Sequence, residues 1–178
     1  MFVNRCLVLF IYGLGLMTVI QSHAQTCNPN ISRTAPDSRY EFLNNDTEVK
    51  DNQTGLIWQR CSIGQNWNGI TCVYSGISAY NWAEAMYNTK IAGNGWRVPN
   101  IKELRSLVEE ACYEPAINEH IFPNSWPDRY YWSSSPVAYP KGHIWTVYLK
   151  TGLVGSMGFL SSGSGQSNSL ILVRDGSK

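Results

Sequence analysis

Charged side chains are scarce in this chain: Lys, Arg, Asp and Glu make up 15% of its 178 residues, against roughly 25% in typical globular proteins. No stretch concentrates Lys and Arg, and the formal net charge is +1. Proteins that bind nucleic acids recognise phosphates through clustered cations. The composition therefore argues against a nucleic acid as partner.

Sequence signatures of catalysis and of metal binding are missing as well. The chain has 3 histidines, and it contains neither a Cys-x-x-Cys pair nor a Gly-x-Ser-x-Gly turn. These two patterns are typical of zinc sites and of serine hydrolases, respectively. We therefore predict no metal, no cofactor and no catalytic residue. One alternative stays open: a secreted hydrolase in which His143 or His120 serves as the base for a loop serine.

Only one long hydrophobic run occurs, and it lies at the beginning of the chain. Arg5 precedes an apolar stretch over residues 6–20, and Ser22-His23-Ala24 follows it. A cation, an apolar stretch and small residues in this order are typical of a secretory signal peptide. We predict that residues 1–24 are a signal peptide and that no membrane span remains after its removal. The protein would then be periplasmic, on the outer surface or secreted; an uncleaved anchor is the alternative.

Four cysteines remain after this segment: Cys27, Cys61, Cys72 and Cys112. An even number in an exported chain indicates two disulfides, and four cysteines allow three pairings; free thiols are the alternative. We predict Cys61–Cys72, which would close a local loop. The second predicted bond, Cys27–Cys112, would hold the N-terminal segment to the end of a helix.

Local patterns predict a single α+β domain over residues 51–178, after an irregular segment over 25–50. Asn81 and Asn100 each stand three residues before a Glu, which is the signature of a helix start. The remaining predictions are strands at 56–61, 130–133, 143–149, 153–159 and 170–173 and a Gly- and Asn-rich loop at 62–76. This order predicts two short helices followed by antiparallel strands, stabilised by disulfides.

The segment before the second helix combines an aromatic ring, a cation and a proline: Trp96-Arg97-Val98-Pro99. We interpret Trp96, Arg97, Pro99 and Glu103 as a structural corner in which a buried Arg97 ties loops together. Direct contact of Arg97 with a ligand is the alternative. Along the helix itself, Leu104, Leu107 and Val108 are predicted to face inward, and Glu109 and Glu110 to be solvated.

Aromatic residues are concentrated in the C-terminal half. We expect ligand recognition in the loops 124–142 and 155–169, where stacking faces, cations and polar groups occur together. The residues predicted to bind are Trp126, Arg129, Tyr130, Tyr139 and Lys141. An ordinary surface without a partner is the alternative.

Several ordered motifs carry a resemblance to a known family. They include residues 51–58 (DNQTGLIW), Trp67-Asn68-Gly69, residues 96–104 (WRVPNIKEL), Tyr131-Trp132-Ser133-Ser134 and Val173-Arg174. Over about residues 40–175 the chain resembles the C-terminal domain of the Legionella collagen-like adhesin (Lcl) family.

This resemblance implies a C-type-lectin-like α+β fold, distantly similar also to formylglycine-generating-enzyme modules. It does not extend to calcium-dependent sugar binding, because Glu114-Pro115-Ala116 lacks the Asn of the lectin motif. The catalytic cysteines of the oxidase relatives are not matched either. The named adhesin binds sulfated polysaccharides from a collagen-like stalk, whereas this chain has no Gly-X-Y stalk.

Together these features predict a non-enzymatic exported binding or adhesion module whose partner is a glycan or a cell-surface protein. A structural or assembly subunit of an envelope complex, with residues 161–169 as its contact, is the alternative. Neither the ligand nor the oligomeric state follows from the sequence.

Overall fold

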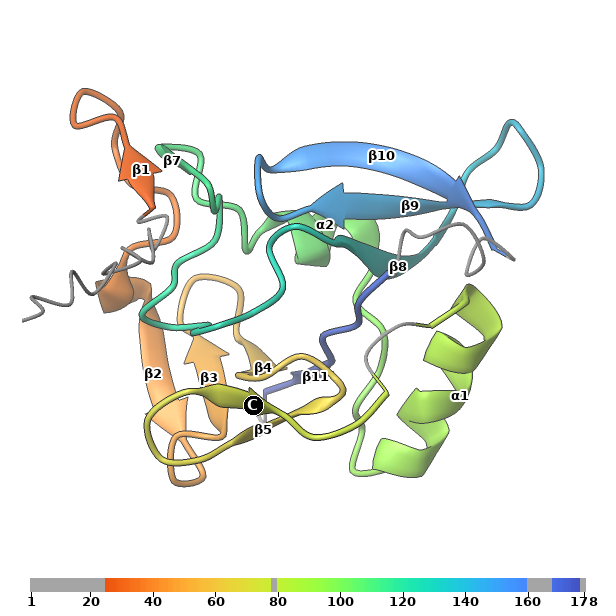
Figure 1. Cartoon of the computed structure of the whole chain (residues 1–178), viewed down its shortest axis with the longest axis horizontal. Coiled ribbons are helices and arrows are strands. Elements are labelled where there is room, and N and C mark those ends of the chain that lie inside the picture. The colour runs from red at the N-terminus through yellow and green to blue at the C-terminus, as the bar shows by residue number, and fades with distance from the viewer. Residues whose placement is uncertain (1–24, 78–79, 160–167, 177–178) are drawn as a thin grey trace, which may run out of the picture.

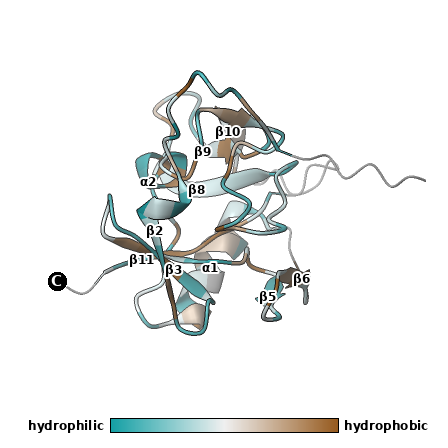
Figure 2. Ribbon diagram, turned by 90° about the vertical axis from the view of Figure 1, so that its left-hand side faces the viewer, coloured by the Kyte–Doolittle hydropathy of each residue, from teal (hydrophilic) through white to brown (hydrophobic). Residues whose placement is uncertain are grey.

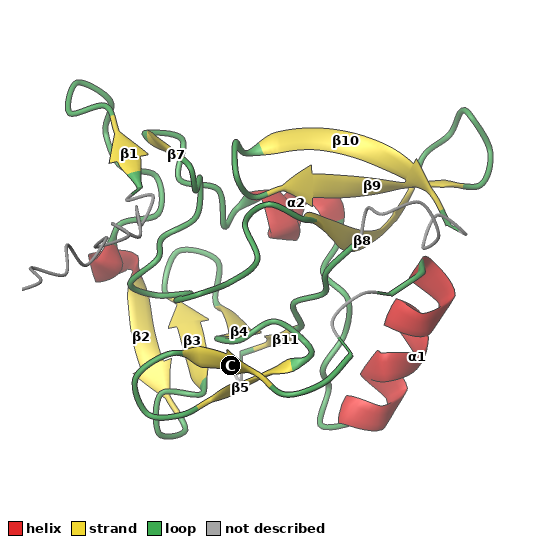
Figure 3. Cartoon of the chain, in the orientation of Figure 1, coloured by secondary structure: helices red, strands yellow, loops and turns green. Residues whose placement is uncertain are grey.

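Antiparallel pairing builds the fold that the computed structural model describes for residues 25–77, 80–159 and 168–176 (Figure 1). The named strands form one sheet of four strands, one of three and two of two strands. Two short α-helices accompany them (Figure 3). The α+β class predicted from the sequence is therefore confirmed, with mostly antiparallel sheets and few helices. The predicted signal peptide at 1–24 and most of the loop 161–169 lie outside the described residues.

The predicted order of elements is wrong at the beginning of the domain. Segment 25–50, predicted to be irregular, contains the following elements: β1 (Thr26–Cys27), the 3-10 turn η1 (Asp37–Arg39), β2 (Tyr40–Leu43) and β3 (Glu48–Asp51). Strands therefore precede the helices as well as follow them. Strand β3 could not be predicted from its composition, because three of its four residues, Glu48–Asp51, are charged. Antiparallel pairing with neighbours on both sides makes it a strand.

The four-stranded sheet has the order β11-β4-β3-β2. Strand β4 (Leu56–Gln59) was predicted, whereas β11 (Val173–Asp175) begins at the last residue of the strand predicted at 170–173. Val49 and Trp58 are register partners in β3 and β4, and both are completely buried. One face of this sheet therefore contributes directly to the core.

The three-stranded sheet consists of β8 (Tyr130–Pro136), β9 (His143–Tyr148) and β10 (Leu153–Gly158), with β9 in the middle. Successive side chains of a strand point to opposite faces, and the sheet consequently serves two cores. Tyr131 and Val147 pack into one hydrophobic cluster, while Trp132 and Ile144 pack into the other. Each of the two clusters is continuous with buried residues from other parts of the chain.

The β9–β10 turn requires a glycine at position 152, because the backbone there lies close to the Val108 side chain. The φ of Gly152 is +76°, and a Cβ placed there would lie 2.7 Å from Cγ1 of Val108. A side chain at this position would be strained by its backbone conformation and would also displace a core residue. The turn thus fixes the hairpin against the segment that follows the second helix.

Both helices begin where the sequence predicts. Helix α1 (Trp82–Ala92) is preceded by Asn81 and α2 (Ile101–Arg105) by Asn100, and each start forms a complete capping box. Helix α2 is short, however, because the chain turns after Arg105 and Val108 forms an isolated antiparallel β-bridge with Ile117. Within the described ranges, no helix has the length and hydropathy needed to cross a membrane.

A third β-region replaces the loop predicted at 62–76. Strands β5 (Gln65–Trp67) and β6 (Cys72–Tyr74) form a small hairpin. Figure 2 shows this hairpin at the rim of the molecule, with the hydrophobic β6 coloured brown. The disulfide Cys61–Cys72 joins its second strand to the end of β4.

The second disulfide, Cys27–Cys112, connects β1 to β7 (Cys112–Tyr113). These two strands pair with each other, and the two cysteines are register partners. Both disulfides of the structure therefore join the cysteines that the sequence analysis paired. The bond Cys27–Cys112 brings residues far apart in the chain together, with a sequence separation of 85.

Glu109 corrects a second prediction. The helical pattern predicts Glu109 on a solvated helix end, but the residue is completely buried. Its carboxylate accepts the backbone N–H groups of Thr34 at 3.0 Å, Ala35 at 2.9 Å and Ala111 at 3.0 Å. Burial alone would raise the pKa of Glu109, but these N–H donors lower it below the ordinary value. Because helix α2 ends at Arg105, the helical periodicity used for the prediction does not apply at this position.

Candidate functional site

The predicted corner around Arg97 is a network of ionic and backbone contacts. The guanidinium donates to Glu103 in a bidentate pair at 2.7 and 2.9 Å and to Asp175 at 2.9 Å. Its backbone also pairs with Val173 of β11. The corner thus connects helix α2 to the C-terminal strand, and its hydrogen bonds with Glu103 raise the pKa of Arg97.

The corner differs from the prediction in one respect. The Arg97 side chain was expected to be buried, but 37% of its surface is exposed. Trp96 is partly buried against the core cluster that contains Trp132, and Arg174 lies over its ring at 5.1 Å. Pro99 is buried, and its carbonyl oxygen accepts the N–H of Ser134 at 2.8 Å. All these contacts are to other parts of the domain, and part of the Arg97 side chain faces solvent.

The five residues predicted to bind a ligand fall into two groups. Trp126, Arg129 and Tyr130 precede or begin β8, whereas Tyr139 and Lys141 lie in the turn between β8 and β9. Tyr130 begins β8, whereas the second group follows Pro136 at the other end of this strand. The structure therefore does not bring all five side chains together.

The first group forms an aromatic surface. The guanidinium carbon of Arg129 lies 4.5 Å from the centroid of the Trp126 ring. Tyr130 stacks on Tyr148 of β9 with a centroid distance of 4.8 Å. All four side chains are partly exposed. In the second group, 87% of the Tyr139 surface and much of Lys141 are exposed.

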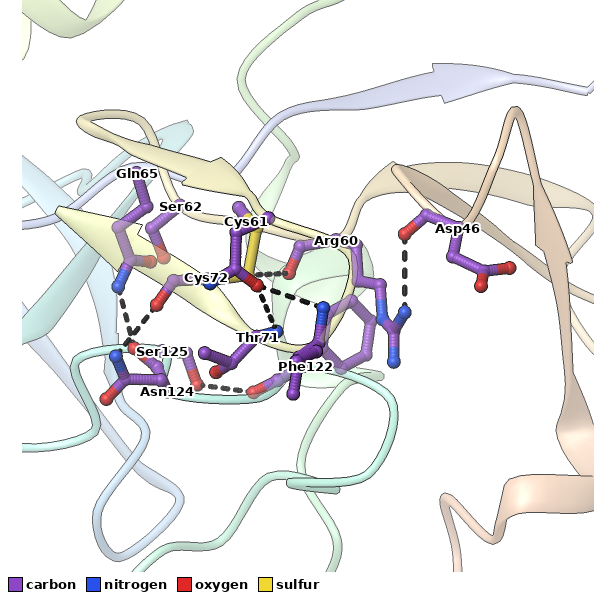
Figure 4. The surroundings of a disulfide bond; sticks show 12 residues. Asp46, Arg60, Cys61, Ser62, Gln65, Thr71, Cys72, Phe122, Asn124 and Ser125 are labelled. Carbon is purple, nitrogen blue, oxygen red and sulfur yellow. Dashed lines mark hydrogen bonds between the residues drawn. A yellow bond between two sulfur atoms is a disulfide. The ribbon is translucent and has the colours of Figure 1, made fainter. Parts of the chain in front are cut away.

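A separate groove of about 340 Å³ lies between the four-stranded sheet and hairpin β5–β6. Its lining includes Glu48, Gln59, Gln65, Asn66, Trp67 and Trp96. Figure 4 shows how its hairpin wall is held: the Gln65 amide donates to the carbonyl oxygen of Asn124 at 2.7 Å. The Asn124 amide in turn donates to the carbonyl oxygen of Cys72 at 2.8 Å. These two bonds and the Cys61–Cys72 disulfide fix the hairpin against the body of the domain.

Arg60 positions one wall of this groove. Its guanidinium carbon lies 3.9 Å from the centroid of the Trp67 ring and 4.3 Å from that of Phe42. The N–H groups donate to the carbonyl oxygens of Ile121 at 2.8 Å and His120 at 3.0 Å. A third bond, to the carbonyl oxygen of Asp46 at 3.3 Å, is drawn in Figure 4. Burial lowers the pKa of Arg60. The buried cation is thus held by two ring faces and three carbonyl oxygens.

The two histidines of the described chain lie in different environments. His120 Nδ1 lies 2.8 Å from Asp37, whose other carboxylate oxygen accepts from Asn118 at 2.7 Å. The hydrogen bond from Asn118 is the main reason why the pKa of Asp37 is lowered. His143 has a buried Nδ1. In the described part of the chain neither ring is hydrogen-bonded to a serine, and no cluster of three or more His, Cys, Asp or Glu side chains could hold a metal ion.

Comparison with known families decides where this domain belongs. A family model described as the Lcl C-terminal domain matches residues 47–174. The chain belongs to the Lcl C-terminal domain family. The matched range begins just before β3 and contains the groove, the Arg97 corner, both helices and the three-stranded sheet. No curated protein and no solved structure matches the chain.

Membership in the Lcl C-terminal domain family makes this an adhesin-associated module, which is not a known enzyme family. The two disulfides and the family together fit an exported protein. The groove between the sheet and the hairpin was missed by sequence reasoning. Two of its lining residues, Trp67 and Trp96, belong to motifs of the family resemblance, but nothing in the sequence placed them side by side. Neither Glu48 nor Gln59 has a local pattern that distinguishes it from an ordinary strand residue.

Proposed function

We propose that this Lcl C-terminal domain is an exported, non-enzymatic binding module that recognises a polysaccharide or a cell-surface protein through the loops of its C-terminal half. The single observation that carries the proposal is the aromatic surface of Trp126, Arg129, Tyr130 and Tyr148 at one end of the three-stranded sheet. Family membership in an adhesin-associated domain supports it. A signal peptide at 1–24 and a C-type-lectin-like architecture belong to the same proposal.

The aromatic surface is already arranged before any partner binds. Tyr130 and Tyr148 are register partners in β8 and β9, so their rings are held in place by strand pairing. Aromatic rings offer a large contact area with few rotatable bonds, and ordering them costs little entropy. Arg129 adds a cation beside the Trp126 ring, which suits a partner that carries anionic or hydroxyl groups.

A recess next to this surface supports the same location. It has a volume of about 230 Å³, and it is lined by Pro127 and Asp128 of the preceding loop and by Lys150 of the β9–β10 turn. Pro115, Glu114 and Glu119 complete it. The recess contains charged groups of both signs, and a partner could use it for hydrogen bonds while it stacks on the aromatic rings.

The test compares the two groups that the structure separates. Wild type, the variant Trp126→Ala/Tyr130→Ala and the variant Tyr139→Ala/Lys141→Ala are applied to an array of neutral and sulfated glycans and to purified surface proteins. We expect the first variant to reduce binding by at least tenfold, and the second to reduce it less. Thermal unfolding verifies that both variants are folded. Full binding by the first variant would refute this placement, and absence of any partner for wild type would refute the function.

A further inference from the structure

The groove beside hairpin β5–β6 has the composition of a binding site. It combines two tryptophans with amide and hydroxyl side chains, among them Gln59, Gln65 and Asn66. Its volume of about 340 Å³ lies within the roughly 300–1,000 Å³ that is usual for small-molecule sites. It lies on elements that contribute nothing to the aromatic surface of the C-terminal half.

Each tryptophan of the groove is supported by an arginine that does not line it. Arg60 lies over Trp67 at 3.9 Å, and Arg174 lies over Trp96 at 5.1 Å. The part of each indole that borders the groove is therefore the part that its arginine leaves uncovered. Within the described residues neither indole N–H has a hydrogen-bond partner.

The polar side chains of the groove are also available. The side-chain amides of Gln59 and Asn66 make no hydrogen bond to any described residue, and Asn66 is exposed. Gln65 is more than nine-tenths buried, and its Oε1 has no partner although its Nε2 donates to Asn124.

The charge of the groove is compensated. Glu48 is its charged lining residue, and it pairs with Arg174 at 2.6 Å. Neither Arg60 nor Arg174 lines the groove, although Arg174 is partly exposed beside Glu48. Because the lining carboxylate of Glu48 is paired with Arg174, a neutral ligand would meet no uncompensated charge in the groove.

We propose that this groove is a second binding site of the protein, and that its ligand is a neutral saccharide. Indole rings pack against the apolar C–H faces of a sugar ring, and the amides of Gln59 and Asn66 have the donors and acceptors that match its hydroxyl groups. The site is distinct from the aromatic surface around Trp126, and either one can fail without the other.

The test uses neutral hexasaccharides of glucose, galactose and N-acetylglucosamine, with a sulfated heparin hexasaccharide for comparison. Binding to the folded exported chain is measured by calorimetry and by tryptophan fluorescence. We expect at least one neutral probe to bind, and the variant Gln59→Ala/Asn66→Ala to weaken it by at least tenfold. The matched control is Asn52→Ala, because Asn52 is exposed in the β3–β4 turn at the opposite end of these strands.

A second variant, Ser75→Tyr, fills the groove from its rim without removing a packed side chain, since Ser75 is exposed and lines it. It should abolish binding of the neutral probe and leave the melting temperature unchanged. The variant Trp126→Ala/Tyr130→Ala should bind this probe like wild type, which separates the result from the proposed function. The inference is wrong if no neutral probe binds, if Gln59→Ala/Asn66→Ala binds normally, or if the sulfated probe binds more tightly at this groove.

Discussion

The carboxylate of Glu109 accepts the backbone N–H of Ala35 at 2.9 Å across 74 positions of the chain. With the N–H groups of Thr34 and Ala111 it forms a buried cluster that attaches the N-terminal segment to the end of the helical region. A buried carboxylate with several N–H donors stabilises a fold only as long as it stays ionised. Glu109 is therefore a structural anion, and the first two predictions depend on it.

Replacement of Glu109 by Gln should lower the free energy of unfolding by about 2–4 kcal/mol. The amide nitrogen of Gln cannot accept a hydrogen bond, so either the N–H of Ala35 or the N–H groups of Thr34 and Ala111 would lose their acceptor. Urea unfolding measures the effect. The neighbouring Glu110→Gln is the matched control, because Glu110 is exposed and pairs only with Arg105. The control should change stability by less than about 0.5 kcal/mol.

The stabilisation by Glu109 should depend on pH. Its pKa in the folded protein lies below the ordinary value of 4.5, so the unfolded chain takes up the proton first as the pH falls. The contribution is complete above that value and is lost progressively as the pH falls through the folded pKa. The gap in unfolding free energy between wild type and Glu109→Gln should therefore be smaller at about pH 3 than at about pH 7, with the change confined to the acidic end of this range. A gap that stays constant over this range would contradict the assignment.

The same residue illustrates what could be read from the sequence. The capping boxes at Asn81 and Asn100 were predictable because an Asn cap and its Glu partner lie within four residues. The burial of Glu109 was not, because helix α2 ends when Val108 pairs with Ile117, and no local pattern announces that pairing. Strand β3 was missed for the same reason.

The candidate sites follow this division between local and distant contacts. The aromatic residues of the C-terminal half were found because they are close together in sequence, but strand β8 then places Trp126 and Tyr139 at opposite ends. The groove joins Glu48, Trp67 and Trp96, which are distant in sequence. Only the folded arrangement shows that they share one surface.

Arg97→Ala should destabilise the protein by about 1–2 kcal/mol, less than expected for a fully buried ion pair. The reason is that 37% of the Arg97 side chain is exposed, so water can replace part of its contact with Glu103. Thermal unfolding measures the change. Arg105→Ala serves as the control, since the pair of Arg105 and Glu110 is exposed on both sides, and its effect should be below about 0.5 kcal/mol. A variant with wild-type stability and lost binding would instead make Arg97 a ligand contact.

Arg60→Lys should lower the free energy of unfolding by about 1–3 kcal/mol although the charge is kept. Lysine has no planar group to lie between the rings of Trp67 and Phe42, and it cannot reach three separate carbonyl oxygens in the same geometry. The fluorescence of the folded protein should also change because Trp67 loses its cationic neighbour. Arg33→Lys is the control, at an exposed position. Equal stability of both variants would show that the ring contacts contribute nothing.

The two disulfides should differ in their contribution to stability. The sequence separation is 11 for Cys61–Cys72 and 85 for Cys27–Cys112, and the loss of chain entropy in the unfolded state grows with this separation. Replacing both cysteines by serine should cost about 3 kcal/mol for the first bond and about 4–5 kcal/mol for the second. Urea unfolding of the two double variants measures both values. Non-reducing peptide mapping checks the pairing, and a peptide that joins Cys27 to Cys61 would overturn it.

The bond Cys27–Cys112 also decides how mechanical load travels through the molecule. A pull applied at residue 25 reaches Cys27 within two residues and passes through the disulfide to Cys112. From there the shortest covalent route to the aromatic surface runs along residues 113–130. The intervening chain, with both helices, hairpin β5–β6 and the groove, lies outside this route. The disulfide therefore takes tension between the N-terminus and a partner held at Trp126 off the covalent chain of residues 28–111. The route passes Asn124, whose hydrogen bonds hold hairpin β5–β6, so the groove would feel this tension through its hairpin wall.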